Sequence, residues 1–238
     1  MIVGDIDILS PSTVNGYGSN LAKHIIPEFT GNQLTKIGTS EIVAFGVKLS
    51  QKGLSNHTVR GILILLGQIL EAARREEYIR ETPMRNVDLP EIDKNQKGRA
   101  LSSAEVSALL AQCNDKLRPV VLIGLLGGLR RSEVFALHWT DDKNSPRSYV
   151  DFENNLIRVR QSIFFKYGRY QTRKDGEPAY IFSSPKSATS IRDVSLSPAL
   201  KRELLALKLR SKDKVGLLFQ TDNGTPVDPN NVCRCSRD

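Results

Sequence analysis

An arginine and a glutamate stand at helical spacing in one short segment, GGLRRSEVFALHW, which runs from Gly127 to Trp139. Two glycines end an almost wholly apolar stretch, and Arg130 follows them three positions before Glu133. A guanidinium can hold a phosphate through two parallel hydrogen bonds, and a helix N-terminus beside it also favours an anion. Glu133, one turn on, is close enough to orient Arg130. The spacing therefore indicates a phosphate site. The same residues also fit a glycine helix cap followed by a surface arginine and its i,i+3 partner.

A second segment of interest, SPKSATSIRDVSL, runs from Ser184 to Leu196. It contains Lys186, then small polar residues, then Arg192 within an alternating pattern that predicts a strand. An isolated exposed lysine is usually only a solvated charge, so any role for Lys186 depends on this order and context. Arg192 is the nearest competitor, but an arginine cannot donate a proton at neutral pH.

The first third of the sequence predicts a small helical bundle that ends near Val87. Ser10 and Pro11 mark the start of the first helix, Pro27 its end, and Ser55 the cap of the third. Apolar residues recur at helical spacing in three stripes: Val14, Tyr17, Leu21 and Ile25; Ile42, Phe45, Gly46 and Leu49; and Val59, Ile62, Leu63, Leu66, Ile69, Leu70 and Ala73.

The sequence then changes character twice. Residues 88–100 are polar, charged and without an apolar period, which is typical of a linker. Ser102 and Glu105 form a capping box for a helix whose predicted buried face is Val106, Leu109, Leu110 and Cys113. Residues 120–126 predict a buried core helix, and a shorter helix is expected from Arg131 to about His138.

Aromatic and β-branched residues predominate after Trp139 and predict a small antiparallel sheet. Ser197 and Pro198 begin a further helix, which carries Leu200, Leu204 and Leu207, and Asp228 and Pro229 begin the last. The expected strands are residues 149–152, 156–165, 180–182, 192–196 and a short 217–219.

The charge of the chain favours an anionic partner, of which nucleic acid is the commonest. Its formal net charge is +8. Residues 1–99 carry 12 Lys and Arg against 11 Asp and Glu, whereas residues 100–238 carry 22 against 15. The second part is therefore the stronger candidate for phosphate contact.

The cysteines and the hydropathy of the chain bear on metal binding, membrane insertion and the cellular compartment. Cys113, Cys233 and Cys235 give no disulfide framework, and a single C-x-C pair is weak evidence for zinc, so we expect no metal site. No apolar run is long enough to span a bilayer, and the first ten residues lack signal-peptide character. We expect a cytoplasmic protein without a membrane partner.

These motifs resemble, in order, those of the tyrosine recombinases, the phage integrase family. The segment around Arg130 and Glu133 resembles box I, and residues 184–196 resemble the β-hairpin whose lysine protonates the departing 5′ oxygen of DNA, a role that falls on Lys186. Residues 10–14, 53–60 and 82–87 resemble the helical core-binding domain of integrases.

The resemblance implies an α+β protein that clamps double-stranded DNA between two domains. Residues 1–90 would form an all-α, SAM-like core-binding bundle, 91–100 the linker, and 101–238 an incomplete mixed α+β catalytic domain with a small antiparallel sheet. Arg130 and Lys186 would be catalytic, with Glu133 in support. The candidate DNA contacts are Lys23, Lys52, Arg60, Arg99, Arg131 and Arg192.

The resemblance also implies groups that we do not find beyond Lys186: a His-x-x-Arg element, a further His or Trp, and a tyrosine nucleophile. His57 and Arg60 have the His-x-x-Arg spacing but lie upstream, and the last tyrosine is Tyr180. We therefore expect a DNA-binding chain, C-terminally truncated, that does not cleave DNA alone and is a monomer. The complete enzyme would meet other recombinase protomers and need no cofactor. Two alternatives are a non-catalytic protein that competes with an intact recombinase for its sites, and a basic α+β protein unrelated to DNA.

Overall fold

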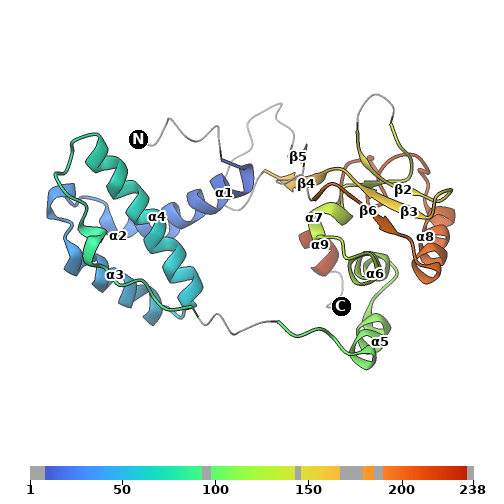
Figure 1. Cartoon of the computed structure of the whole chain (residues 1–238), viewed down its shortest axis with the longest axis horizontal. Helices are drawn as coiled ribbons and strands as arrows, with labels where there is room; N and C mark the ends of the chain where they lie inside the picture. Colours follow the sequence, from blue (N-terminus) through green and yellow to red (C-terminus); the bar gives the residue numbers. More distant parts are fainter. Residues whose placement is uncertain (1–8, 93–97, 143–145, 167–178, 185–189, 235–238) are drawn as a thin grey trace. The chain divides into compact units, whose positions relative to one another are not determined.

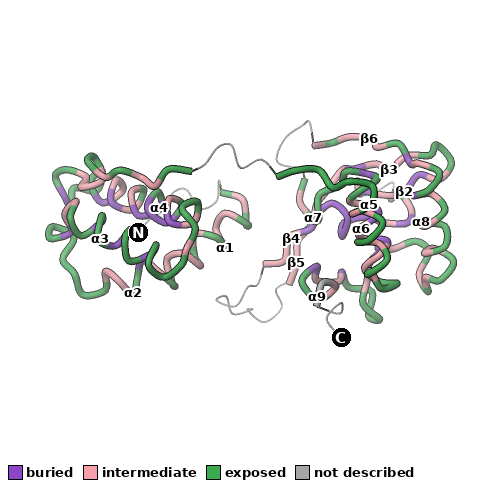
Figure 2. Tube along the Cα trace, turned by 90° about the horizontal axis from the view of Figure 1, so that it is seen from below, coloured by how far each residue is buried: buried purple, intermediate pink, exposed green. Residues whose placement is uncertain are grey.

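The structure, a computed structural model, describes residues 9–92, 98–142, 146–166, 179–184 and 190–234. They divide into two compact units between Arg99 and Ala100 (Figure 1). Each unit has a hydrophobic core of its own, and Figure 2 shows the buried residues as separate groups. Within the described ranges, no helix is both long and apolar enough to cross a membrane.

Helical segments and their connections make up the described part of the N-terminal unit. They are α1 (Pro11–Asn20), the π-helical turn η2 (Leu21–Ile25), α2 (Ile26–Phe29), the 3-10 turn η3 (Leu34–Lys36), α3 (Thr39–Gln51), α4 (Asn56–Arg75) and the 3-10 turn η4 (Pro83–Asn86).

Helices α3 and α4 supply most of the core of this unit. The Ser55 hydroxyl accepts the backbone N–H of Thr58 and so caps α4, as the sequence predicts. Leu65 joins the predicted apolar stripe of α4, whereas Ile69 is only partly buried. Each large aliphatic side chain buried here contributes about 1.5–3 kcal/mol to stability. The buried face of α3 is the predicted one, Ile42, Phe45, Gly46 and Leu49.

Pro27 does not end the first helix, contrary to the sequence prediction. The chain passes from α1 through η2, where the N–H of Ile26 donates to the carbonyl of Leu21, and Pro27 stands in the first turn of α2. A proline ring clashes with the carbonyl four residues earlier in a regular α-helix, and the wider π-turn relieves that clash. The helical path therefore continues to Phe29, whose ring packs edge-on against Phe45.

The C-terminal unit combines helices with short strands, and the predicted α+β class is confirmed. Helices α6 and α8 pack against each other (Figure 1). The elements are α5 (Ser103–Gln112), α6 (Leu117–Gly127), α7 (Arg131–Val134), β1 (Leu137–His138), β2 (Ser148–Asp151), β3 (Leu156–Val159), β4 (Ser162–Phe165), β5 (Tyr180–Ser183), β6 (Arg192–Ser195), α8 (Pro198–Arg210) and α9 (Pro229–Arg234).

The described strands form two sheets, and one pairing is parallel, so the prediction of a single antiparallel sheet is wrong in detail. The first sheet has the order β1-β2-β3-β6; its β1–β2 pair is parallel and the other two pairs are antiparallel. Strands β4 and β5 form a separate antiparallel pair. The predicted strand 156–165 divides at Arg160 and Gln161, because both backbone N–H groups donate to the side-chain hydroxyl of Ser148 instead of to a backbone carbonyl of a neighbouring strand.

The short helix after Arg130 is half its predicted length. It ends at Val134, and the backbone of Leu137 accepts from the N–H of Leu218 while the N–H of Trp139 donates to Gly216. These bonds draw the chain into β1. The predicted strand 217–219 is therefore not a full strand; it is joined to β1 by an isolated antiparallel bridge between Leu217 and His138.

Helices α5 and α6 are less buried than their apolar patterns predict. Leu109 of α5 is exposed, and no residue of that helix is fully buried. The predicted Ser102–Glu105 capping box is nevertheless formed. In α6, Leu122 and Ile123 face the core, whereas the following pair, Leu125 and Leu126, are exposed. The end of α6 is set by Gly128, whose φ of 62° is the left-handed conformation that favours glycine.

We predict that Gly128→Ala lowers stability and that Gly124→Ala does not, although both glycines belong to the end of α6. A Cβ on Gly128 meets no atom within 4 Å, so only backbone strain acts, and the free energy of unfolding should fall by about 1–2 kcal/mol. Gly124 is helical and its Cβ would lie 4.0 Å from the Leu129 carbonyl, so alanine should be neutral or stabilise by up to about 1 kcal/mol. Urea unfolding of both variants measures the difference; equal effects would contradict the assigned cap.

Candidate nucleic-acid interface

Arg130 is presented at the surface by the turn that follows α6. Gly128 reverses the chain, and Leu129 then enters the core with 6% of its surface exposed. Arg130 comes next, as the residue before α7, and 68% of its side chain is exposed. Because α7 has only four residues, its dipole is small, and the charge of Arg130 is the main attraction for an anion.

Glu133 lies beneath this arginine and is only 3% exposed. One carboxylate oxygen, Oε2, accepts the backbone N–H of Arg130 at 2.8 Å, and the other, Oε1, accepts Nη1 of the same residue at 2.9 Å. Arg130 Nη1 also lies 3.4 Å from the Ser190 hydroxyl. Both the backbone and the side chain of Arg130 are therefore fixed by one buried carboxylate.

Arg192 approaches the same carboxylate from strand β6. Its Nη2 donates to Glu133 Oε2 at 2.8 Å and its Nη1 donates to Oε1 at 3.1 Å, which is the two-pronged geometry of an arginine–carboxylate pair. The same two nitrogens also donate to the backbone carbonyls of Gly128 and Ser190, each at 3.2 Å. Arg192 thus connects the turn, α7 and β6. We call Arg130, Glu133 and Arg192 the arginine–glutamate cluster.

The electrostatics of this cluster follow from its contacts. Burial alone would raise the pKa of Glu133, but the hydrogen bonds from Arg192 and Arg130 outweigh it, and the pKa lies below the ordinary 4.5. The hydrogen bond to Glu133 raises the pKa of Arg192. All three groups are charged at neutral pH, so the cluster carries one net positive charge. It is suited to binding an anion and not to donating a proton.

Strand β6 is held in place by a second set of ion pairs. Arg158 of the neighbouring strand donates to both Asp151 and Asp193, and Arg160 donates to Asp193 and to the Arg192 carbonyl. Arg192 and Asp193 are neighbours on the strand and therefore point to opposite faces. The outward residue fixes the strand to the sheet, while the inward one reaches Glu133.

Two curated proteins resemble the chain in sequence. It is 31% identical over 199 residues to the ICEBs1 integrase of Bacillus subtilis (strain 168). This match covers 83% of the chain and 48% of that protein. It is 26% identical over 246 residues to a protein named tyrosine recombinase XerC-like from Caldanaerobacter subterraneus subsp. tengcongensis, which covers 94% of the chain and 60% of that protein. The chain thus spans about half the length of these relatives. No family model matches it.

Solved integrase structures share the fold. The Tn1549 transposon integrase (residues 82–397) in complex with circular intermediate DNA superposes with a TM-score of 0.68 at 19% identity, over 94% of this chain and 69% of that chain. A lambda integrase dimer bound to a COC′ core site gives a TM-score of 0.64 at 16% identity, over 96% and 58%. The chain is therefore similar in sequence to an integrase and to a tyrosine recombinase, and it shares the fold of the solved integrases.

The recombinase lysine predicted at position 186 lies outside the described residues. The strands on either side of it are described: β5 pairs with β4, and β6 pairs with β3. The two flanking strands therefore belong to different sheets, and they are not hydrogen-bonded to each other as the arms of a simple hairpin would be. The described end of β6 carries Arg192, which is joined to Glu133.

Two predicted DNA contacts of the N-terminal unit lie close to the same histidine. Burial lowers the pKa of His24, and the positive charges of Lys52 and Lys23 lower it further. Arg60 is different, because its Nη1 donates to the Pro90 carbonyl at 3.1 Å and holds the chain that leaves the bundle. His57, the start of the coincidental His-x-x-Arg, is exposed on α4.

The other predicted contacts lie in or next to the C-terminal unit. Arg131 is exposed, and its Nη1 lies 3.5 Å from Asn230 Oδ1 in α9. Arg99 is exposed at the end of the N-terminal unit. Neither joins the arginine–glutamate cluster.

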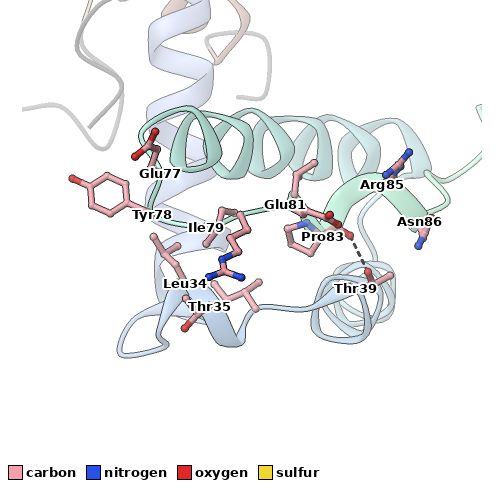
Figure 3. Close-up of a pocket in the computed structure, with 13 residues that line it drawn as sticks. Leu34, Thr35, Thr39, Glu77, Tyr78, Ile79, Glu81, Pro83, Arg85 and Asn86 are labelled. Atoms are coloured by element: carbon pink, nitrogen blue, oxygen red, sulfur yellow. Dashed lines mark hydrogen bonds between the residues drawn. The ribbon is translucent and has the colours of Figure 1, made fainter.

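A cavity of about 570 Å³ in the N-terminal unit is separate from all the predicted site residues. It lies between η3, the start of α3 and the connection from α4 to η4, where the Thr39 hydroxyl donates to the Pro83 carbonyl (Figure 3). Polar side chains, among them Glu77, Arg80 and Glu81, make up most of its lining, together with the aliphatic Leu34, Ile37 and Ile79.

The contact that sequence reasoning missed is the one between Glu133 and Arg192, which are 59 positions apart. A signal was present, because alternation along residues 192–196 puts Arg192 on the same face as Val194, which packs against the core. An arginine on an inward face needs a buried acid, and Glu133 is the most buried acid described in this unit.

We predict that Glu133→Gln lowers the free energy of unfolding by about 3 kcal/mol at neutral pH, because two arginines lose their buried partner. The pKa of Glu133 is depressed, so its contribution is fully present above about pH 4.5 and is lost as the pH falls through the folded pKa. The difference between wild type and variant should therefore shrink in acid. Denaturant unfolding across pH measures this.

The matched control is Glu203→Gln, which removes a half-exposed pair with Arg118. It should cost less than about 1 kcal/mol. A Glu133 effect that stays constant far below pH 4.5 would contradict the depressed pKa.

Proposed function

We propose that the chain binds duplex DNA and serves site-specific recombination, in the manner of the integrases that integrate DNA. The observation that carries the proposal is Arg130: a largely exposed guanidinium, fixed on one side by a buried carboxylate and available on the other. Its Nε and Nη2 have no partner among the described residues, and these two nitrogens can hold a phosphate in parallel.

The comparisons support DNA as the partner. The Tn1549 and lambda integrases share this fold and are bound to DNA in their structures. The excess of basic residues in the second part of the chain agrees with phosphate contact. We propose that the N-terminal unit acts as the core-binding domain, with Lys23 and Lys52 on phosphates, and that the C-terminal unit acts as the catalytic domain.

We further propose that these 238 residues do not cleave DNA by themselves. Covalent catalysis in this family needs a tyrosine that attacks phosphorus and forms a 3′-phosphotyrosyl bond. No tyrosine follows Lys186 in the sequence, and the three residues of the arginine–glutamate cluster include no tyrosine. Arg130 and Lys186 would then contribute phosphate binding without chemistry.

We predict that Arg130→Ala weakens binding to duplex DNA about tenfold, because one charged phosphate contact is lost. The plot of the logarithm of the binding constant against the logarithm of the salt concentration should become less steep by about 0.9, the value for one phosphate. The fold should persist, because Glu133 keeps Arg192. Fluorescence anisotropy over a salt series, with thermal unfolding beside it, makes both measurements.

Arg202→Ala is the control, since it removes an exposed arginine of α8 outside the cluster. It should change the affinity less than Arg130→Ala does. Wild-type binding that does not weaken with salt would refute the DNA-binding proposal.

We also predict that the chain forms no covalent adduct with a nicked duplex designed to trap a phosphotyrosyl intermediate. Denaturing electrophoresis of the mixture should show only free protein and intact DNA. A shifted band that carries both protein and DNA label would show that another residue supplies the nucleophile.

A further inference from the structure

The arginine–glutamate cluster contains two guanidiniums and one carboxylate, and the two arginines share it unequally. Arg192 uses both terminal nitrogens on Glu133, one for each oxygen. The Arg130 side chain uses one nitrogen on one oxygen, and its second contact comes from its backbone. The stronger pair is therefore Glu133 with Arg192.

The surroundings of Arg192 disfavour a direct contact with DNA. Its side chain is 29% exposed, against 68% for Arg130. Each terminal nitrogen already donates to Glu133 and to one backbone carbonyl, of Gly128 or Ser190. A phosphate would have to displace these bonds, and a buried carboxylate would be left without its partner.

We propose that Arg192 is a positioning residue, which neutralises Glu133 so that Arg130 keeps a full positive charge for a phosphate. The proposal rests on the proposed function, DNA binding through Arg130. Without Arg192, the buried carboxylate has Arg130 as its remaining cationic partner, and the guanidinium turns inward to satisfy it. The net charge of the cluster then falls from one to zero.

The position of Arg192 makes this neutralisation independent of DNA. The Arg192 carbonyl accepts from Arg160, and the next residue, Asp193, is held by Arg158 and Arg160. Strand β6 is thereby fixed to the sheet, and the guanidinium of Arg192 is fixed to the Gly128 carbonyl. The cluster is therefore assembled before any anion arrives.

The test measures salt-dependent binding of the whole chain to a mixed-sequence DNA duplex. Arg192→Gln should weaken binding about tenfold, as Arg130→Ala does. The double variant should lose less than the two single losses combined, because the phosphate contact that Arg192 supports is already absent in Arg130→Ala. The decisive variant is Arg192→Gln with Glu133→Gln. It restores one net charge to the cluster, and its affinity should rise at least about threefold above that of Arg192→Gln.

Arg118→Ala is the matched control, because it breaks the ion pair of a similarly exposed arginine of the same unit with Glu203 and leaves both β6 and Glu133 untouched. It should leave the DNA affinity nearly unchanged. If Arg192→Gln does not unfold cooperatively, Arg192→Lys replaces it. A lysine also neutralises Glu133, so this variant should keep its affinity within about threefold of wild type.

Three results would overturn the inference while leaving DNA binding intact: additive losses in the Arg130 and Arg192 double variant, no recovery on adding Glu133→Gln, or a tenfold loss in Arg192→Lys. Wild-type chain without salt-sensitive DNA binding is a different outcome. It would refute the proposed function and the inference with it.

Discussion

A buried carboxylate is the constraint on which the candidate site depends. Glu133 is almost completely removed from water, and an ionised group in that position is stable only with charged partners in good geometry. Its partners come from two places far apart in sequence, the turn after α6 and strand β6. The turn, α7 and β6 must therefore meet at one point, and that meeting presents Arg130 to solvent.

The sheet holds β6 in register and so keeps Arg192 next to Glu133. Ser148 divides residues 156–165 into β3 and β4 by accepting two backbone N–H groups, and β3 pairs with β6. Arg158 and Arg160 then fix the outward side of β6 through Asp193. Beneath the sheet, Trp139, Phe135 and Ile157 belong to one core cluster with the buried residues of α6 and α8. Core packing therefore supports the sheet, and the ion pairs hold β6 in place on it.

Features that depend on neighbours in sequence could be predicted. The buried face of α3 and the caps Ser55, Ser102 and Ser197 follow from local spacing, and so does the proximity of Arg130 to Glu133. Features set by distant partners could not. The exposure of Leu109 depends on what α5 packs against, and the short α7 depends on bonds to Leu218 and Gly216. The π-turn before Pro27 is local, but proline normally signals an ending.

A single arginine held by a single acid would be a poor phosphate site. The carboxylate would fix the guanidinium and cancel its charge, whereas an arginine without the acid would keep its charge but lose about 0.5–1.5 kcal/mol on being ordered by DNA. The second arginine resolves this conflict, because Arg192 supplies the neutralising charge and Glu133 can still orient Arg130. Placing that second charge on another element has a structural consequence. The charge that we propose for phosphate binding then depends on the register of β6, so a shift of that strand would weaken the site without touching it.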